Sequence, residues 1–144
     1  MRFTVHPKFG IFALKIFQFS GIPQIYNAAL CPHPPTAVFA APVIEWVKLQ
    51  LKPGTNKSSW SDSFAKFEQI LKTAAGYVSH ATGWVVEDPN AFFIMIGWET
   101  IKAHRDWIAN DGGEEAAQFY IVGGTSGLNM VHVVPSGAIP ARLS

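Results

Sequence analysis

The chain has 144 residues, of which 49% are hydrophobic and 15% are charged, and its net charge is +1. This length allows one domain with a substantial core. Nucleic-acid binding requires a clustered positive field, so the charge balance predicts no nucleic-acid partner. The single cysteine, Cys31, excludes an intrachain disulfide and a thiolate metal cluster and favours a reducing compartment.

The first forty residues contain no acidic side chain. Their apolar stretch, residues 9–19, is interrupted by Lys15 and is too short to span a bilayer, so we expect no membrane association. Arg2 and Lys8 before it are compatible with a targeting signal, whereas the prolines that follow favour a disordered or loosely attached extension. We assign residues 1–41 to an N-terminal extension, 42–135 to the folded domain and 136–144 to a tail, and expect a cytoplasmic location unless the extension is a targeting signal.

Periodicity predicts the first four elements of the domain. Residues 43–52 alternate like a half-buried strand from Glu45 onward. Residues 59–75 are expected to form a helix that begins at a capping box of Ser59 and Asp62. An apolar stripe runs along this helix at Trp60, Phe64, Phe67, Leu71 and Ala74. Residues 77–87 and 91–98 form a hairpin around the turn signal Asp88-Pro89-Asn90.

A second helix is predicted from Thr100 to about Asn110. His104 lies on its apolar stripe, together with Ile101 and Ile108. Gly112-Gly113 is expected to end this helix, residues 114–120 to add a short further one, and residues 128–134 to form the last strand.

This order of elements predicts an α+β fold, ferredoxin-like βαββαβ, with an antiparallel sheet and helices on one face. The strand 92–98 is apolar on both faces, so the second face of the sheet also requires a cover. The chain has no element left to supply that cover. A second copy of the chain is therefore expected to do so, which makes the protein a homodimer.

The stretches "VIEWVKLQLKPG", "FFIMIGWETIKAHRDWI" and "MVHVVP" resemble the dimeric α/β-barrel superfamily, and most closely its antibiotic-biosynthesis-monooxygenase-like (ABM-like) branch. The resemblance covers residues 42–135. It implies ferredoxin-like protomers whose sheets pack face to face into a dimeric α/β barrel, with a pocket between sheet and helices. Members include cofactor-free monooxygenases of aromatic polyketides, polyketide cyclases, haem-degrading enzymes and stress-response proteins.

The resemblance carries over unevenly to single residues. Trp107 matches a tryptophan that the cofactor-free monooxygenases and haem-degrading enzymes use, but their first-strand asparagine is replaced by Val47. The axial histidine of the haem-degrading enzymes would fall within "EEAAQFY", which contains none. The plant polyketide cyclase of this superfamily uses a tyrosine at the position of Trp107. It also uses a histidine a few residues later, where the segment "ANDGG" of this chain has none. The resemblance therefore implies no haem ligand, and we expect no bound cofactor.

His104 and His132 are the leading catalytic candidates, with Trp107 beside them. An inward-facing imidazole on the helix stripe can act as a general base near neutral pH. His132 shares an apolar strand face with Leu128 and Met130. The alternative for His104 is a buried imidazole bonded to a backbone carbonyl. For His132 the sequence leaves open whether its strand face lines the pocket or the dimer interface.

Four further residues are candidates for substrate binding. Trp98, like Trp107, offers a large flat surface for an aromatic ligand, and ordinary core packing is the alternative for each of them. Phe92 is the second candidate. Glu45 is expected to point inward, where burial would raise its pKa, unless it lies in water at the strand end. His80 is the fourth. The histidines form no HxH or HxxxH pair, so the sequence predicts no metal site.

Two functions follow from these observations. The first is a small cofactor-independent monooxygenase or polyketide cyclase of secondary metabolism, which removes a proton from an aromatic or polyketide-like substrate in an apolar pocket. The second is a non-catalytic dimeric ligand-binding or stress-response protein that uses the same pocket. The sequence leaves open whether the protein is an enzyme.

Overall fold

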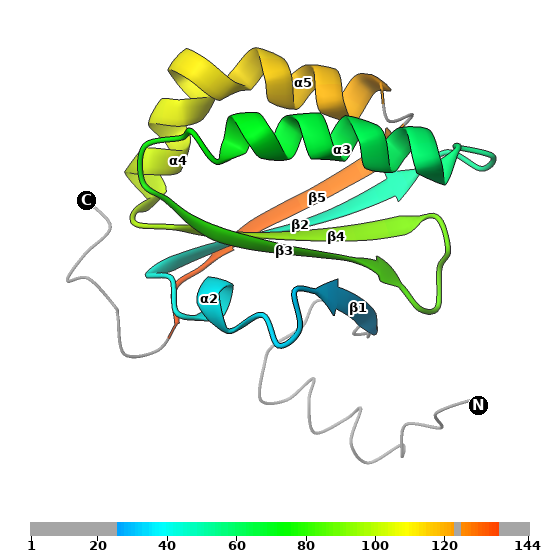
Figure 1. Ribbon diagram of the computed structural model, residues 1–144, viewed down its shortest axis with the longest axis horizontal. Helices are drawn as coiled ribbons and strands as arrows, with labels where there is room; N and C mark the ends of the chain where they lie inside the picture. Colours follow the sequence, from blue (N-terminus) through cyan, green and yellow to red (C-terminus); the bar gives the residue numbers. More distant parts are fainter. Residues whose placement is uncertain (1–25, 123–124, 136–144) are drawn as a thin grey trace, which may run out of the picture.

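The computed structural model describes residues 26–122 and 125–135, which form a two-layer α+β fold (Figure 1). One antiparallel sheet has the strand order β1-β3-β4-β2-β5. The strands are β1 (Ala28–Cys31), β2 (Val43–Leu51), β3 (Tyr77–Val85), β4 (Ala91–Trp98) and β5 (Thr125–Val133). The helices are α2 (Thr36–Phe39), α3 (Lys57–Leu71), α4 (Ile101–Trp107), the π-helical turn η1 (Ile108–Gly112) and α5 (Gly113–Val122). No helix among the described residues has the length and apolarity to cross a membrane.

The predicted ferredoxin-like order is confirmed. From β2 to β5 the elements run βαββαβ, with the second helical segment made of α4, η1 and α5, and Figure 1 shows α3, α4 and α5 on one face of the sheet. Alternation along β2 turns Val47, Leu49 and Leu51 toward these helices, where they are buried. The predicted hairpin of β3 and β4 is also present.

Helix α3 begins earlier than its sequence pattern suggests. The predicted capping box at Ser59 is wrong, because Asn56 is the N-cap and its Oδ1 accepts hydrogen bonds from the backbone N–H groups of Ser58 and Ser59, at 2.9 and 3.2 Å. The predicted stripe does face the core, with Trp60, Phe67 and Leu71 fully buried.

The prediction that Gly112-Gly113 ends the second helix is also wrong. Helix α4 continues through η1 directly into α5. A Cβ atom at Gly112 would lie 2.0 Å from Cε2 of Trp107, so a glycine is required where this indole packs against the helix backbone. The two glycines thus belong to a wide helical turn around Trp107, and π-helical turns of this kind are frequent at functional sites.

The second face of the sheet is partly covered by the chain itself, contrary to the expectation that no element remained for it. Helix α2 lies on this face, opposite the other helices (Figure 1). Its Val38, 1% exposed, packs with Ile44, Ala81 and Met95. Strand β1 also pairs with β3. The predicted extension therefore contributes β1 and α2 to the folded unit, while its residues 1–25 and the predicted tail lie outside the described residues.

Strand β5 remains open. It occupies an edge of the sheet and leaves large apolar side chains exposed on both faces. Val131 and Val133 are 59% and 41% exposed on the face away from the helices, and Leu128 and Met130 are 42% and 37% exposed on the helical side. An apolar edge strand is a surface that proteins usually cover.

The contribution of α2 can be tested with two neighbouring substitutions. Val38→Asp places an unpaired carboxylate in the cluster beneath α2 and should lower the free energy of unfolding by about 3 kcal/mol or more. Phe39→Asp, at a position that is 48% exposed, should change it by less than about 1 kcal/mol. Urea unfolding of both variants checks this, and equal effects would show that α2 does not cover the sheet in solution.

Candidate functional site

A cluster of three ionisable side chains lies between the sheet and α4. Strands β2 and β5 pair with Glu45 opposite His132, so both side chains point to the helical face. Helix α4 places His104 over them. Glu45 and His104 are only 2% and 6% exposed, whereas His132 is the most accessible of the three. The predicted inward positions of Glu45 and His104 are confirmed.

The contacts form a continuous chain. The indole N–H of Trp98 donates a hydrogen bond to Glu45 Oε2 at 2.9 Å. The same oxygen lies 3.5 Å from Nε2 of His104, whose Nδ1 is 2.9 Å from Nε2 of His132. The chain therefore runs from a buried indole, through a carboxyl and two imidazoles, to the edge of the sheet.

Burial controls the charge state of this chain. It raises the pKa of Glu45 from 4.5 to about 7, and the hydrogen bond from Trp98 offsets only part of the rise. Burial, with smaller contributions from the charges of His132 and Arg105, lowers the pKa of His104 to about 4. Burial and Arg105 also lower the pKa of His132. Near neutral pH both imidazoles are therefore neutral, and Glu45 is the group poised to exchange a proton.

Aromatic rings enclose the buried end of the chain. The ring of His104 lies 5.0 Å from that of Trp98, which in turn lies 5.7 Å from that of Trp107. Tyr120 is a neighbour of Glu45 that sequence reasoning missed. Burial and the charge of Glu45 raise the pKa of the Tyr120 hydroxyl. Its spacing of four residues from the buried Ala116 on α5 is the sequence signal for its inward position.

Two predicted site residues lie in other clusters. Nδ1 of His80 is 2.7 Å from the hydroxyl of Tyr77, and its Nε2 is 3.4 Å from Glu68. Phe92 belongs to an aromatic group with Trp60, Phe64 and Trp84. The structure thus brings together Glu45, Trp98, His104, Trp107 and His132, and not His80 or Phe92.

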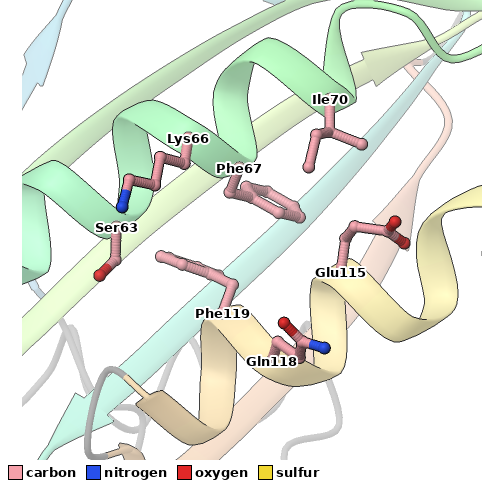
Figure 2. A pocket seen from close by; sticks show the side chains of 7 residues that line it. All are labelled: Ser63, Lys66, Phe67, Ile70, Glu115, Gln118 and Phe119. Atoms are coloured by element: carbon pink, nitrogen blue, oxygen red, sulfur yellow. The ribbon is translucent and has the colours of Figure 1, made fainter.

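Two clefts open near the aromatic core. In Figure 2, side chains of α3 and α5 surround the rings of Phe67 and Phe119, which stack at 4.7 Å. The second cleft lies at the far end of β3 and is lined by Ala29, Cys31, Trp60, Ser61, Phe64, Thr82, Gly83, Trp84 and Phe92. Phe92 therefore lines a cleft, though not beside Glu45.

The first cleft is separated from Glu45 by aromatic rings. The ring of Phe67 lies 6.1 Å from that of Trp107, which contacts the ring of Trp98. A ligand in this cleft would reach the carboxyl only after these rings moved, whereas His132 is accessible from the sheet edge.

Comparison with known proteins shows similarity of fold. No family model and no curated protein matches the chain. Among solved structures, SnoaB, a cofactor-independent oxygenase from Streptomyces nogalater, is 16% identical, with a TM-score of 0.58 over 71% of this chain and 100% of its own. A candidate antibiotic biosynthesis monooxygenase from Deinococcus radiodurans is 16% identical, with a TM-score of 0.57 over 69% and 98% of the two chains. PA3566 from Pseudomonas aeruginosa is 9% identical, with a TM-score of 0.55 over 66% and 94%.

The chain has an ABM-like fold. The resemblance seen in the sequence is thereby confirmed for the architecture. At these identities the ABM-like fold specifies no reaction, so the chemistry must be argued from the site itself.

The pKa of Glu45 predicts how stability depends on pH. The pKa of Glu45 is higher in the folded protein than its ordinary value. The contribution of this group to the stability of the fold is therefore complete below pH 4.5 and is lost as the pH rises through about 7. His104 acts oppositely, since its contribution is present above 6.5 and is lost as the pH falls through about 4. Comparing Glu45→Gln with the wild-type protein isolates the first effect. Between pH 4.5 and pH 8, the free energy of unfolding of the variant should rise by roughly 3 kcal/mol relative to that of the wild-type protein, since each pKa unit corresponds to about 1.4 kcal/mol.

Denaturant unfolding in EDTA-containing buffer at several pH values measures this difference. Glu99→Gln, which removes an exposed carboxyl after β4, is the matched control. An equal pH dependence in both variants would contradict the burial argument.

Proposed function

We propose that the protein is a cofactor-independent enzyme that removes a proton from an aromatic or polyketide-like substrate, as a monooxygenase or a cyclase. The observation that carries the proposal is the chain of contacts from His132 through His104 to Glu45. It links an accessible imidazole to a buried carboxyl whose pKa of about 7 suits proton exchange near neutral pH. The shared fold with SnoaB, a cofactor-independent oxygenase, supports it by analogy.

His132 is the group that would meet the substrate. In the required tautomers, Nε2–H of His132 donates to His104, and Nε2–H of His104 donates to the Glu45 carboxylate. A substrate C–H or phenolic proton passes to Nδ1 of His132 while each of the two N–H protons moves one step inward. The proton ends on Glu45, and both imidazoles are neutral again. This direction is favoured because the pKa of Glu45 exceeds that of His104.

The resulting carbanion has two outcomes. In oxidation it passes one electron to O₂, and the two radicals combine into a peroxide. Return of the proton and loss of water then leave a ketone, so that one CH₂ and one O₂ become one C=O and one H₂O. In cyclisation the carbanion adds to a carbonyl carbon of the same molecule, and the stored proton is returned to the alkoxide. Neither outcome requires an organic cofactor.

The surroundings favour a flat and largely uncharged substrate. The ring of Trp98 lies against the buried His104 and that of Trp107 against Trp98, and the exposed Leu128 and Met130 lie on the same face of β5 as His132. Apolar walls with a few placed polar groups are typical of sites for such ligands. In this proposal the catalytic residues are His104, His132 and Trp107. Trp98 and Glu45 complete the site.

A binding protein without catalysis is the second candidate. It is favoured by the aromatic rings that separate the cleft between α3 and α5 from Glu45. A ligand held in that cleft would meet Phe67 and Phe119 but no ionisable group of the cluster (Figure 2).

We also infer that the protein is a homodimer that buries the edge strand β5. Its exposed valines would be covered by a second subunit, as the resemblance implies for this fold. His132 lies on the same strand, so the partner would border the entrance to the proton relay. We further propose a cytoplasmic location. The exposed free thiol of Cys31 supports it, because free thiols persist in reducing compartments.

Turnover of an anthrone or poly-β-keto substrate, followed by mass spectrometry, tests the relay. His132→Ala and His104→Ala should each lower kcat by about 10²–10⁴-fold, which is the usual contribution of a positioned base. Lys102→Ala, on α4 beside His104 but with its side chain 81% exposed, should retain activity. Full activity in both histidine variants would exclude the relay, and absence of turnover in the wild-type protein would favour the binding protein.

The oligomeric state tests the interface. Val131→Lys introduces a charge at the centre of the exposed edge and should convert a dimer to a monomer in light scattering coupled to gel filtration. Val86→Lys, at a residue that is 70% exposed beyond the end of β3, should leave the mass unchanged. A wild-type monomer at high concentration would contradict the dimer.

A further inference from the structure

We propose that Glu45, His104 and His132 form a binding site for one divalent transition-metal ion of the Zn²⁺ type. Two imidazoles and one carboxylate are an established ligand set for zinc and for other transition metals. The sequence pattern predicted no such site because the histidines form no local pair. The fold replaces that pair by bringing together one residue each from β2, α4 and β5.

The distances suit a metal ion. Each of the three residues offers a ligand atom, and these atoms all lie within 4.8 Å of one another. In a tetrahedral site with bonds of about 2.0–2.1 Å, ligand atoms lie roughly 3.3 Å apart. The 3.5 Å between Nε2 of His104 and Glu45 is already close to this value. The 2.9 Å to His132 is measured from Nδ1, the other ring nitrogen of His104, so one ion can use only one of these two contacts.

A small rearrangement would complete the site. The two contacts use opposite nitrogens of His104: Nδ1 faces His132 and Nε2 faces Glu45. A metal takes one of these nitrogens, so either Glu45 or His132 must move toward that nitrogen before all three residues can bind one ion. His132 lies on the edge strand and has room to move, and Glu45 has the rotamer freedom of its side chain.

The chemistry of the cluster also favours a cation. Among the described residues, no lysine or arginine forms an ion pair with Glu45, and its carboxyl is almost wholly removed from water. A buried carboxylate is costly unless it is paired or coordinates a metal. A divalent ion would satisfy the carboxylate and the free electron pairs of both imidazoles at once, without adding another side chain.

Access lies on the side of His132. An ion entering from the edge of β5 would meet this imidazole first, and with three protein ligands it would keep an open position for water or another small ligand. The half-buried His80 has fewer partners of this kind: it lies near one carboxylate, Glu68, and its second nitrogen is bonded to Tyr77. His80 therefore provides the control.

Metal binding and the proton relay use the same atoms. An ion on His104 and His132 occupies the electron pairs through which a proton would pass, so the loaded protein should be inactive in the reaction proposed above. This consequence rests on the proposed function, whereas the binding site itself does not.

Titration of the full-length, tag-free protein with Co²⁺ tests the site, because Co²⁺ replaces Zn²⁺ and its visible spectrum reports the ligand geometry. We expect one ion per chain, with the intense absorption of a four- or five-coordinate site and competitive displacement by Zn²⁺. Glu45→Gln, His104→Ala and His132→Ala should each weaken Co²⁺ binding by at least roughly tenfold, since even changes to outer-shell partners cost 10–100-fold. His80→Ala should bind as the wild-type protein does.

Several results would overturn the site. These are the absence of stoichiometric Co²⁺ binding, an octahedral aqua-type spectrum, or affinity unchanged in His132→Ala. Because His132 is the most accessible of the three, its variant is the one expected to retain the fold, which circular dichroism verifies. Zn²⁺ should also raise the Tm of the wild-type protein and of His80→Ala, but not that of His132→Ala.

The outcomes separate this site from the proposed enzyme. Co²⁺ binding without turnover in the metal-free protein supports the metal site and contradicts the relay. Turnover in EDTA without Co²⁺ binding supports the relay and contradicts the metal site. Turnover in EDTA that is lost on adding one equivalent of Zn²⁺ supports both.

Discussion

The candidate site depends on the burial of one carboxyl group. Glu45 stands in a strand whose other inward positions include Val47, Leu49 and Leu51, and an aliphatic residue there would avoid the cost of removing a carboxylate from water. The protein offsets this cost with a hydrogen bond from Trp98 and with a higher pKa, which leaves part of the population neutral near pH 7. A group held between its two charge states responds strongly to any proton or cation that reaches it.

The rest of the fold keeps that carboxyl in contact with the histidines. Antiparallel pairing of β2 with β5 places His132 directly opposite Glu45, and a shift of one residue would turn His132 to the other face of the sheet. Helix α4 is held over the pair by Trp107, whose indole packs against Gly112 in the π-helical turn. The turn lets α4 and α5 follow one another without a loop, so that His104 and Tyr120 both lie close to Glu45.

Periodicity was sufficient for the parts of this arrangement that are local. The inward positions of Glu45 and His104 follow from strand alternation and from a helical stripe, and both are confirmed. Helix α2 could not be found this way, because four residues are too few to show a helical period. Nor could its cover of the sheet be found, since the contact of Val38 with Met95 depends on tertiary packing.

The three-residue cluster shows the same limit at the site. Its members are separated by 59 and 28 positions in the chain, and a metal pattern sought as a local histidine pair is blind to such spacing. The elements were predicted, but which residues of β2 and β5 stand opposite each other is decided by the pairing register, and the sequence pattern left that register open. Spacing rules therefore identify metal sites carried on one loop or helix and miss those assembled across a sheet.

The exposed edge strand β5 connects the proposed dimer with the proton relay and the metal site proposed for this cluster. Strand β5 carries His132, and it also carries the exposed apolar side chains that the proposed second subunit would cover. Anything that covers this edge therefore also alters the access of substrate, water or a metal ion to the outer imidazole. The buried end of the chain, by contrast, is shielded by Trp98 and Trp107 and is insulated from such changes. Under the two proposals, assembly and chemistry would be coupled through this one strand. A partner that buried the β5 edge would lower the dielectric around His132, disfavour its charged form further, and drive a proton captured by the proposed relay more strongly toward Glu45.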